Sequence, residues 1–158
     1  MAYVSLDSDQ IKRAHKKHKY TKEQVEQLEQ CMDEKTGPLF FMKTFMKIQH
    51  PTKGEMPFNP YPYQERLIEA YNSHRFSISM LPRQTGKTTC ASGYLIWYAM
   101  FRPDSQILIA AHKYAGASDI MSRVRYAYEM LPSWIKAGVT QYNLSLIHIS
   151  EPTRRITI

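Results

Sequence analysis

The pattern of apolar and polar residues predicts alternating strands and helices in the second half of the chain. Apolar residues alternate with serines over residues 76–80, and a long apolar stretch follows over residues 90–101. A continuous apolar run over residues 106–111 precedes an amphipathic stretch from Ser118 to Leu131. Alternation with a period of two indicates a strand, whereas apolar residues three or four positions apart indicate a helix. This order is typical of a parallel α/β sheet, with the run over 106–111 buried on both faces.

The first half of the chain predicts helices and an extended connection. Thr21 to Gln24 has the pattern of a capping box, apolar residues follow at helical spacing, and Gly37-Pro38 is expected to end that helix. A second helix with an apolar face is expected over residues 39–48. Four prolines between His50 and Pro62 predict an extended connection, after which a helix should run from Tyr63 to Asn72.

Between the first predicted strand of the α/β unit and its helix lies the segment LPRQTGKTT, residues 81–89. A tight loop that ends in Gly86-Lys87-Thr88 directly before a helix is typical of a phosphate-binding loop. The backbone N–H groups and the helix N-terminus bind the anion, and the lysine reaches the outer phosphates. The usual pattern has glycine where this chain has Leu81, and Pro82 has no N–H to donate. The alternative is a chance Gly-Lys-Thr in a turn.

Three segments together resemble one protein family, the large terminase subunits that package phage DNA. PRQTGKTT, residues 82–89, is similar to the deviant phosphate loop of that family. Residues 48–64, IQHPTKGEMPFNPYPYQ, resemble the segment leading into its adenine-binding motif, and residues 106–139 resemble its second strand and helix. The resemblance implies an N-terminal fragment with a truncated P-loop ATPase fold, similar to the parallel sheet of RecA and helicases. We expect a helical appendage over 1–49 and a partial ATPase domain over 50–143.

The loop chemistry and the resemblance together assign roles to eight residues that would bind ATP and Mg²⁺. Gly86 lets the backbone approach the phosphates, Lys87 neutralises them, and the Thr88 hydroxyl binds Mg²⁺. In the family that this chain resembles, the loop arginine, here Arg83, supplies positive charge to the transition state. A glutamine at the position of Gln64 contacts adenine in that family. Arg83 and Lys87 are therefore the candidate catalytic residues. The alternatives are an ion pair for Arg83 and an ordinary exposed side chain for Gln64. The full candidate site is Gln64, Arg83, Gln84, Thr85, Gly86, Lys87, Thr88 and Thr89.

The resemblance implies that ATP hydrolysis powers the packaging of double-stranded DNA into a capsid. The implied partners of the intact motor are the portal protein, the small terminase subunit and other copies in a ring, in the cytoplasm of the host. The acidic strand that would hold the water bound to Mg²⁺ is not found in this sequence, nor are nuclease carboxylates, so we expect negligible turnover from the fragment alone. The alternatives are another helicase-like motor ATPase and a non-catalytic protein that binds nucleotides or DNA.

The last residues have a different character. Residues 144–154, LSLIHISEPTR, resemble the translation of a sequencing adapter, so residues 144–158 are predicted to be a non-native tail. The alternative is a short genuine strand. Without this tail, which holds one acidic and two basic residues, the net charge of the chain falls from +7 to +6.

Composition adds three limits. The basic balance suits a protein that works beside DNA, and basic residues crowd the first twenty positions, either as a DNA contact or as a solvated helix. Cys31 and Cys90 lie far apart, which favours reduced thiols over a disulfide or a zinc site. No apolar run reaches membrane-spanning length, and no signal peptide follows Met1, so we expect a soluble intracellular protein without a membrane partner.

Overall fold

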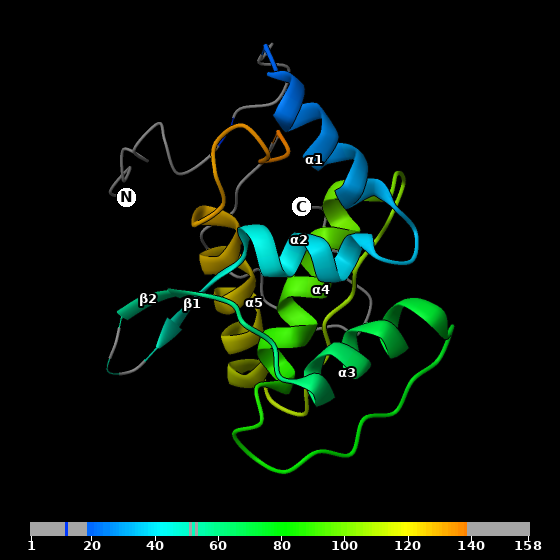
Figure 1. Ribbon diagram of the computed structural model, residues 1–158. Helices are drawn as coiled ribbons and strands as arrows, with labels where there is room; N and C mark the ends of the chain where they lie inside the picture. The colour runs from blue at the N-terminus through cyan, green and yellow to red at the C-terminus, as the bar shows by residue number, and fades with distance from the viewer. Residues whose placement is uncertain (1–11, 13–18, 51, 53, 139–158) are drawn as a thin grey trace.

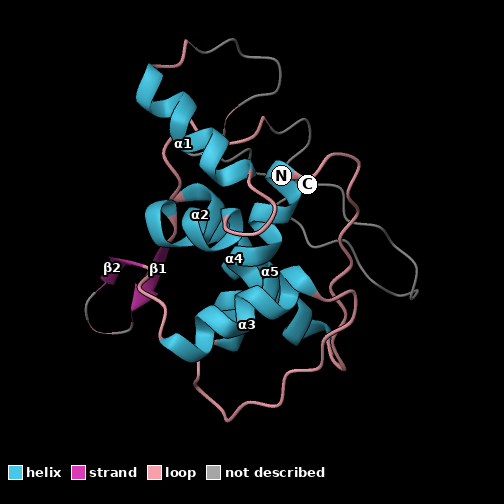
Figure 2. Ribbon diagram, turned by 45° about the vertical axis from the view of Figure 1, so that its right-hand side comes forward, coloured by secondary structure: helices cyan, strands magenta, loops and turns pink. Residues whose placement is uncertain are grey.

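The computed structural model describes residues 12, 19–50, 52 and 54–138, and five helices account for most of this part. They are α1 (Lys22–Met32), α2 (Gly37–Phe45), α3 (Pro62–Ser73), α4 (Lys87–Phe101) and α5 (Tyr114–Glu129). Two short strands, β1 (Lys47–His50) and β2 (Gly54–Pro57), pair antiparallel and lie to one side of the helices (Figures 1 and 2). The structure therefore confirms the predicted presence of both helices and strands, with the strands limited to one two-stranded sheet in the described residues.

Helix α4 lies in the middle of the molecule and packs against α2, α3 and α5 (Figure 1). Trp97 and Cys90 on this helix are fully buried. At Gly93 an added Cβ would lie 2.5 Å from the Met42 Cε and Met46 Sδ atoms, so the absence of a side chain there lets α2 approach closely. Contacts on several sides explain why the helix is apolar nearly all round, as its sequence predicted.

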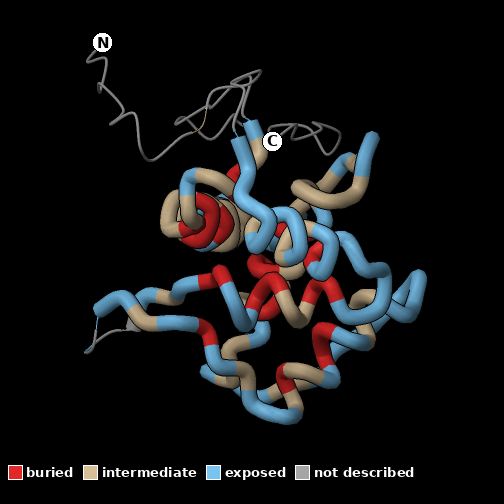
Figure 3. Tube along the Cα trace, turned by 45° about the horizontal axis from the view of Figure 1, so that its top comes forward, coloured by how far each residue is buried: buried red, intermediate tan, exposed pale blue. Residues whose placement is uncertain are grey.

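The buried side chains form one hydrophobic core that joins the N-terminal helices to α3, α4 and α5. In Figure 3 the buried positions lie where the helices meet, and the outer turns are exposed. The boundary predicted near residue 49 is not tested by this packing and stays a prediction. The core includes Phe41, Met42, Phe45, Ile68, Ile96, Trp97, Val124, Tyr128 and Ile135.

Both cysteines belong to this core, and both are free thiols, as the sequence predicted. Burial raises the pKa of Cys31 to about 12 and that of Cys90 to about 11, because the thiolate is poorly solvated inside the protein. The two thiols are therefore neutral at physiological pH and act as small apolar side chains.

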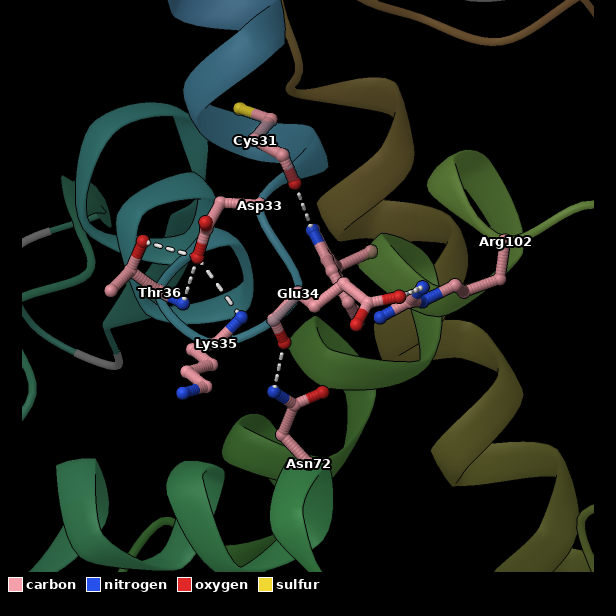
Figure 4. A network of polar contacts seen from close by, with 8 residues as sticks. Cys31, Asp33, Glu34, Lys35, Thr36, Asn72 and Arg102 are labelled. Carbon is pink, nitrogen blue, oxygen red and sulfur yellow. Dashed lines mark hydrogen bonds and ion pairs between the residues drawn. The ribbon is translucent and has the colours of Figure 1, made fainter.

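The turn over residues 33–36 connects α1, α2, α3 and α4 through polar contacts (Figure 4). One carboxylate oxygen of Asp33 accepts hydrogen bonds from the Lys35 N–H at 2.9 Å, the Thr36 N–H at 2.6 Å and the Thr36 hydroxyl at 2.8 Å. The Glu34 backbone carbonyl accepts from the Asn72 side-chain amide on α3. The Glu34 carboxylate pairs with Arg102, the residue after α4, at 3.0 Å.

A buried hydrogen bond completes this connection. The Trp97 indole N–H on α4 donates to the Cys31 backbone carbonyl at the end of α1, at 2.7 Å. The Arg102 guanidinium also lies over the Trp97 ring, 5.3 Å from its centroid. Because a helix leaves its last carbonyls without intrahelical partners, the indole satisfies a group that burial would otherwise leave unpaired.

The predicted helices are confirmed, with differences at their ends. The capping box is present, with hydrogen bonds of 3.1 and 3.3 Å between Thr21 and Gln24, and α5 begins four residues before Ser118. The prediction that Gly37-Pro38 ends the first helix is wrong. The helix ends at Met32, and Pro38 lies in the first turn of α2, where a missing N–H removes no helical hydrogen bond.

The second predicted helix also ends early, at Phe45, and residues 47–50 form β1. Part of the predicted extended connection is therefore a hairpin, in which Lys47 lies opposite Pro57 and His50 lies opposite Gly54. Gly54 adopts a φ of +72° at the turn, a left-handed conformation that costs glycine little.

The two strands predicted for a parallel sheet are not formed in the described residues. Residues 77–82 have no regular secondary structure, and in residues 106–111 a single bridge position occurs at Ile107. The expectation that residues 106–111 are buried on both faces is wrong, because Leu108 is 60% exposed. A strand requires a neighbouring strand to satisfy its backbone, and β1–β2 is the one sheet in the described part of the chain.

The Ser92 hydroxyl on α4 gives a test of the core. It is buried and has no hydrogen-bond partner among the described residues. Ser92→Ala should raise the free energy of unfolding by about 1 kcal/mol, because alanine removes an unsatisfied polar group and favours the helix. The same change at exposed Ser122, whose hydroxyl donates to the Ser118 carbonyl at 2.9 Å, is the control and should have little effect. Thermal unfolding measures both, and a lower melting temperature for Ser92→Ala would contradict the assignment.

The Asp33 carboxylate gives a test that depends on pH. Hydrogen bonds from the Thr36 N–H, the Thr36 hydroxyl and the Lys35 N–H lower the pKa of Asp33. A lowered pKa in the folded state stabilises the fold above the unfolded pKa of about 3.9, and this contribution is lost as the pH falls through the folded pKa. Asp33→Ala should therefore destabilise the protein at pH 7 and lose less stability than the parent on acidification below pH 4. Urea unfolding at pH 7 and pH 3 measures this, with exposed Glu29→Ala as the control.

Candidate functional site

The loop before α4 makes a tight turn through two residues with left-handed backbone. Gln84 has a φ of +63°, and Gly86, which is the N-cap of α4, has a φ of +75°. The Thr85 hydroxyl donates to the Pro82 carbonyl at 3.0 Å and closes the turn. Loops with left-handed residues at such short intervals turn their backbone N–H groups towards a common point, an arrangement that suits an anion.

The N-terminus of α4 has the electrostatics of an anion site. Helices leave the first N–H groups without intrahelical partners, and the helix dipole makes this end positive. No side chain caps this end of α4 among the described residues, and its first turn contains no acidic residue. Lys87 is the first residue of the helix and adds a full positive charge. Phosphate is the common biological anion that such an end binds.

The Lys87 ammonium group lies over the loop. It donates to the Leu81 carbonyl at 3.2 Å and is 3.5 Å from the Pro82 carbonyl. These are the two positions at which the sequence departs from the usual pattern. Both contribute carbonyl oxygens to the contacts of Lys87, so the missing N–H of proline does not disturb this part of the loop.

Gln64 lies beside the loop, although it is 21 positions before Thr85 in the sequence. Its side-chain N–H donates to the Thr85 carbonyl at 3.0 Å, and its side-chain oxygen accepts from the Tyr61 N–H at 2.9 Å. The side chain is buried, and a Cβ at Gly86 would lie 2.6 Å from its nitrogen. Glycine at position 86 is therefore required both by the positive φ and by the close approach of Gln64.

The other predicted site residues lie along the same turn and the start of α4. Arg83 and Gln84 are exposed, and Thr85, Thr88 and Thr89 are half-buried. The structure thus brings all eight candidates to one region, at which α3 and α4 begin. In the described part of the chain, no group of three or more histidine, cysteine or acidic residues has the arrangement of a metal site.

Sequence reasoning missed Tyr63 and Tyr61. The Tyr63 hydroxyl donates to the same Thr85 carbonyl as Gln64 does, at 3.0 Å. Its ring stacks on that of Tyr61, with centroids 5.8 Å apart and planes 6° apart. The signal was present as Tyr61-Pro62-Tyr63 directly before Gln64, because the proline starts α3 and so fixes the two rings near the loop.

One family model matches the chain, that of the N-terminal part of the T4likevirus-type terminase large subunit. The match covers residues 78–156, which is half of the 158-residue chain. It contains the loop, α4 and α5, whereas Gln64 and the first three helices precede it. Residues 144–154, for which an adapter origin was predicted, lie inside the matched range and outside the described residues, and that origin stays a prediction.

The match agrees with the resemblance found in residues 82–89 and supports a role in the packaging of phage DNA. The chain belongs to the T4-like terminase large subunit family, in its N-terminal part.

Proposed function

We propose that residues 83–89 and Gln64 bind ATP with Mg²⁺, and that hydrolysis of this ATP powers the packaging of double-stranded phage DNA. The observation that carries the proposal is the position of Lys87 over a loop with two left-handed residues, at an uncapped helix N-terminus. The donor set at the start of α4 consists of backbone N–H groups and cations, which suits an anion. The charge and donors of these residues suit a nucleoside triphosphate.

Each residue has a defined part in this proposal. The N–H groups at the start of α4 and Lys87 would hold the phosphates, and the Thr88 hydroxyl would bind the metal. Bound Mg²⁺ supplies charge that neutralises the phosphate oxygens. Arg83 is exposed at the loop, from which a guanidinium can reach phosphate oxygens and stabilise the charge that develops on them.

The partners follow from the family and the charge. We propose that the chain acts in the host cell as part of a motor with the portal protein, the small terminase subunit and further copies in a ring. The net charge of +7 favours proximity to DNA. None of the described helices has the length and apolar character needed to cross a membrane.

The substitutions Lys87→Ala and Arg83→Ala test the proposal by separating binding from chemistry. Lys87→Ala should weaken binding of a fluorescent ATP analogue to the 158-residue chain at least tenfold, because it removes a charge beside the phosphates. Arg83→Ala should leave this affinity nearly unchanged and should lower turnover about 10³-fold in the full-length large subunit, the range for such arginines. If the parent chain binds no ATP analogue with Mg²⁺, the nucleotide site is wrong. If Arg83→Ala binds as weakly as Lys87→Ala, Arg83 is a binding residue only.

Gln64 and Tyr63 form a matched pair that tests adenine recognition. Tyr63→Phe removes one hydrogen bond to the Thr85 carbonyl, so affinity for ATP and for GTP should fall by the same factor, about three- to tenfold. Gln64→Ala removes a loop contact and the proposed adenine contact, so it should also reduce the preference for ATP over GTP. Competition titrations with the two nucleotides measure both factors. A preference unchanged by Gln64→Ala would show that Gln64 acts on the loop alone.

A further inference from the structure

Thr85 is held by the protein through both its side chain and its backbone. Its hydroxyl donates to the Pro82 carbonyl at 3.0 Å, across the turn before α4. Its carbonyl accepts from the Tyr63 hydroxyl and from the Gln64 side-chain N–H, each at 3.0 Å. The first contact joins the two ends of the turn, and the other two join the turn to α3. The side chain at position 85 therefore has a part in the loop that the phosphate-loop pattern, in which this position is variable, does not specify.

The turn requires such a hydrogen bond because it contains a strained residue. Gln84 has a φ of +63°, in the left-handed region that residues with a Cβ rarely adopt. A residue in this region keeps its conformation only where neighbouring contacts hold it. Gln84 lies inside the four residues from Pro82 to Thr85, and the Thr85 hydroxyl joins the two ends of this unit. The hydroxyl thus offsets the cost of the left-handed conformation of Gln84.

The Pro82 carbonyl has a second donor, Lys87, which has another task in the proposed function. The Lys87 ammonium group lies 3.5 Å from the Pro82 carbonyl and 3.2 Å from the Leu81 carbonyl. Lys87 must also contact the phosphates, and its ammonium group has three N–H donors to divide among these partners. Because the Thr85 hydroxyl also donates to the Pro82 carbonyl, that carbonyl keeps a partner when Lys87 turns to a phosphate. The shape of the turn then does not depend on the position of Lys87.

We propose that Thr85 is a positioning residue of the nucleotide site, and that its hydroxyl acts on the loop rather than by contact with the nucleotide. The hydroxyl holds the turn from Pro82 to Thr85 in the shape that directs the loop N–H groups to the phosphates, and it leaves Lys87 free to bind them. This role rests on the proposed function, because the shape of the turn affects binding only where the loop binds an anion. It differs from the role of Thr88, whose hydroxyl is proposed to bind Mg²⁺.

Substitutions at position 85 separate the hydroxyl from the shape of the side chain. Thr85→Val keeps the branched shape and removes the hydroxyl. It should weaken binding of a fluorescent ATP analogue with Mg²⁺ to the 158-residue chain about three- to tenfold, the effect of one hydrogen bond. Thr85→Ser keeps the hydroxyl, so its affinity should lie within about twofold of that of the parent. Thr44→Val makes the first change at an exposed position of α2 and is the control, with no effect expected on affinity.

Backbone ¹⁵N relaxation of the nucleotide-free chain tests the turn without any ligand. In the parent, the order parameters of Gln84, Thr85 and Gly86 should be about 0.85, the value for rigid backbone. In Thr85→Val they should fall towards about 0.6, because the turn loses the hydrogen bond that holds it, and in Thr85→Ser they should return to the parent values. This measurement detects the loss of the hydrogen bond independently of nucleotide binding.

The two measurements together distinguish the possible outcomes. Order parameters and affinity that both fall in Thr85→Val and both return in Thr85→Ser support the role of the hydroxyl. Unchanged order parameters in Thr85→Val, or a more mobile loop that binds the analogue as tightly as the parent does, would overturn it. An equal loss of affinity in Thr85→Ser would overturn it as well, because the hydroxyl would then not be the group that matters. A parent chain that binds no analogue would overturn the proposed function instead, and the order parameters would still decide whether the hydroxyl holds the turn.

Discussion

The burial of α4 is the constraint on which the rest of the structure depends. This helix begins at Lys87, directly after the loop over residues 81–86, and other helices cover it along its length, with Gly93 close to Met42 on α2. Its indole N–H at Trp97 must find an acceptor inside the protein, and the acceptor is the last residue but one of α1. Because that single hydrogen bond is buried, the position of α4 also fixes where α1 ends and where the turn to α2 begins.

The site is built from backbone groups held by side chains that lie elsewhere. Two donors, Tyr63 and Gln64, converge on the Thr85 carbonyl, and both belong to the first turn of α3. The beginning of α3 therefore sets the path of the loop that begins α4. The adenine contact proposed for Gln64 and the phosphate contact proposed for Lys87 would therefore be linked through the Thr85 peptide group.

Sequence reasoning succeeded where the relevant interactions are local. The capping box at Thr21 and the helix after Gly86 depend on residues a few positions apart, and both are found. The strands failed because pairing is not local: nothing in the segment around Ile78 specifies which strand lies beside it. Pro38 was misplaced because proline favours either side of a helix boundary. The family resemblance predicted that Gln64 lies near the loop. The sequence alone provided no reason to choose Tyr63, among the tyrosines of the chain, as the one whose hydroxyl contacts the loop.

The end of α1 and the turn over residues 33–36 hold the C-terminal end of α4. A helix of 15 residues is about 22 Å long, so the two ends of α4 make separate sets of contacts. Its C-terminal end is held by Trp97 and Arg102 against Cys31 and Glu34, while its N-terminal end follows the loop that closes at Gly86. The two ends of α4 are thus held by different parts of the chain, the C-terminal end by α1 and the turn after it, and the loop at the N-terminal end by the first turn of α3.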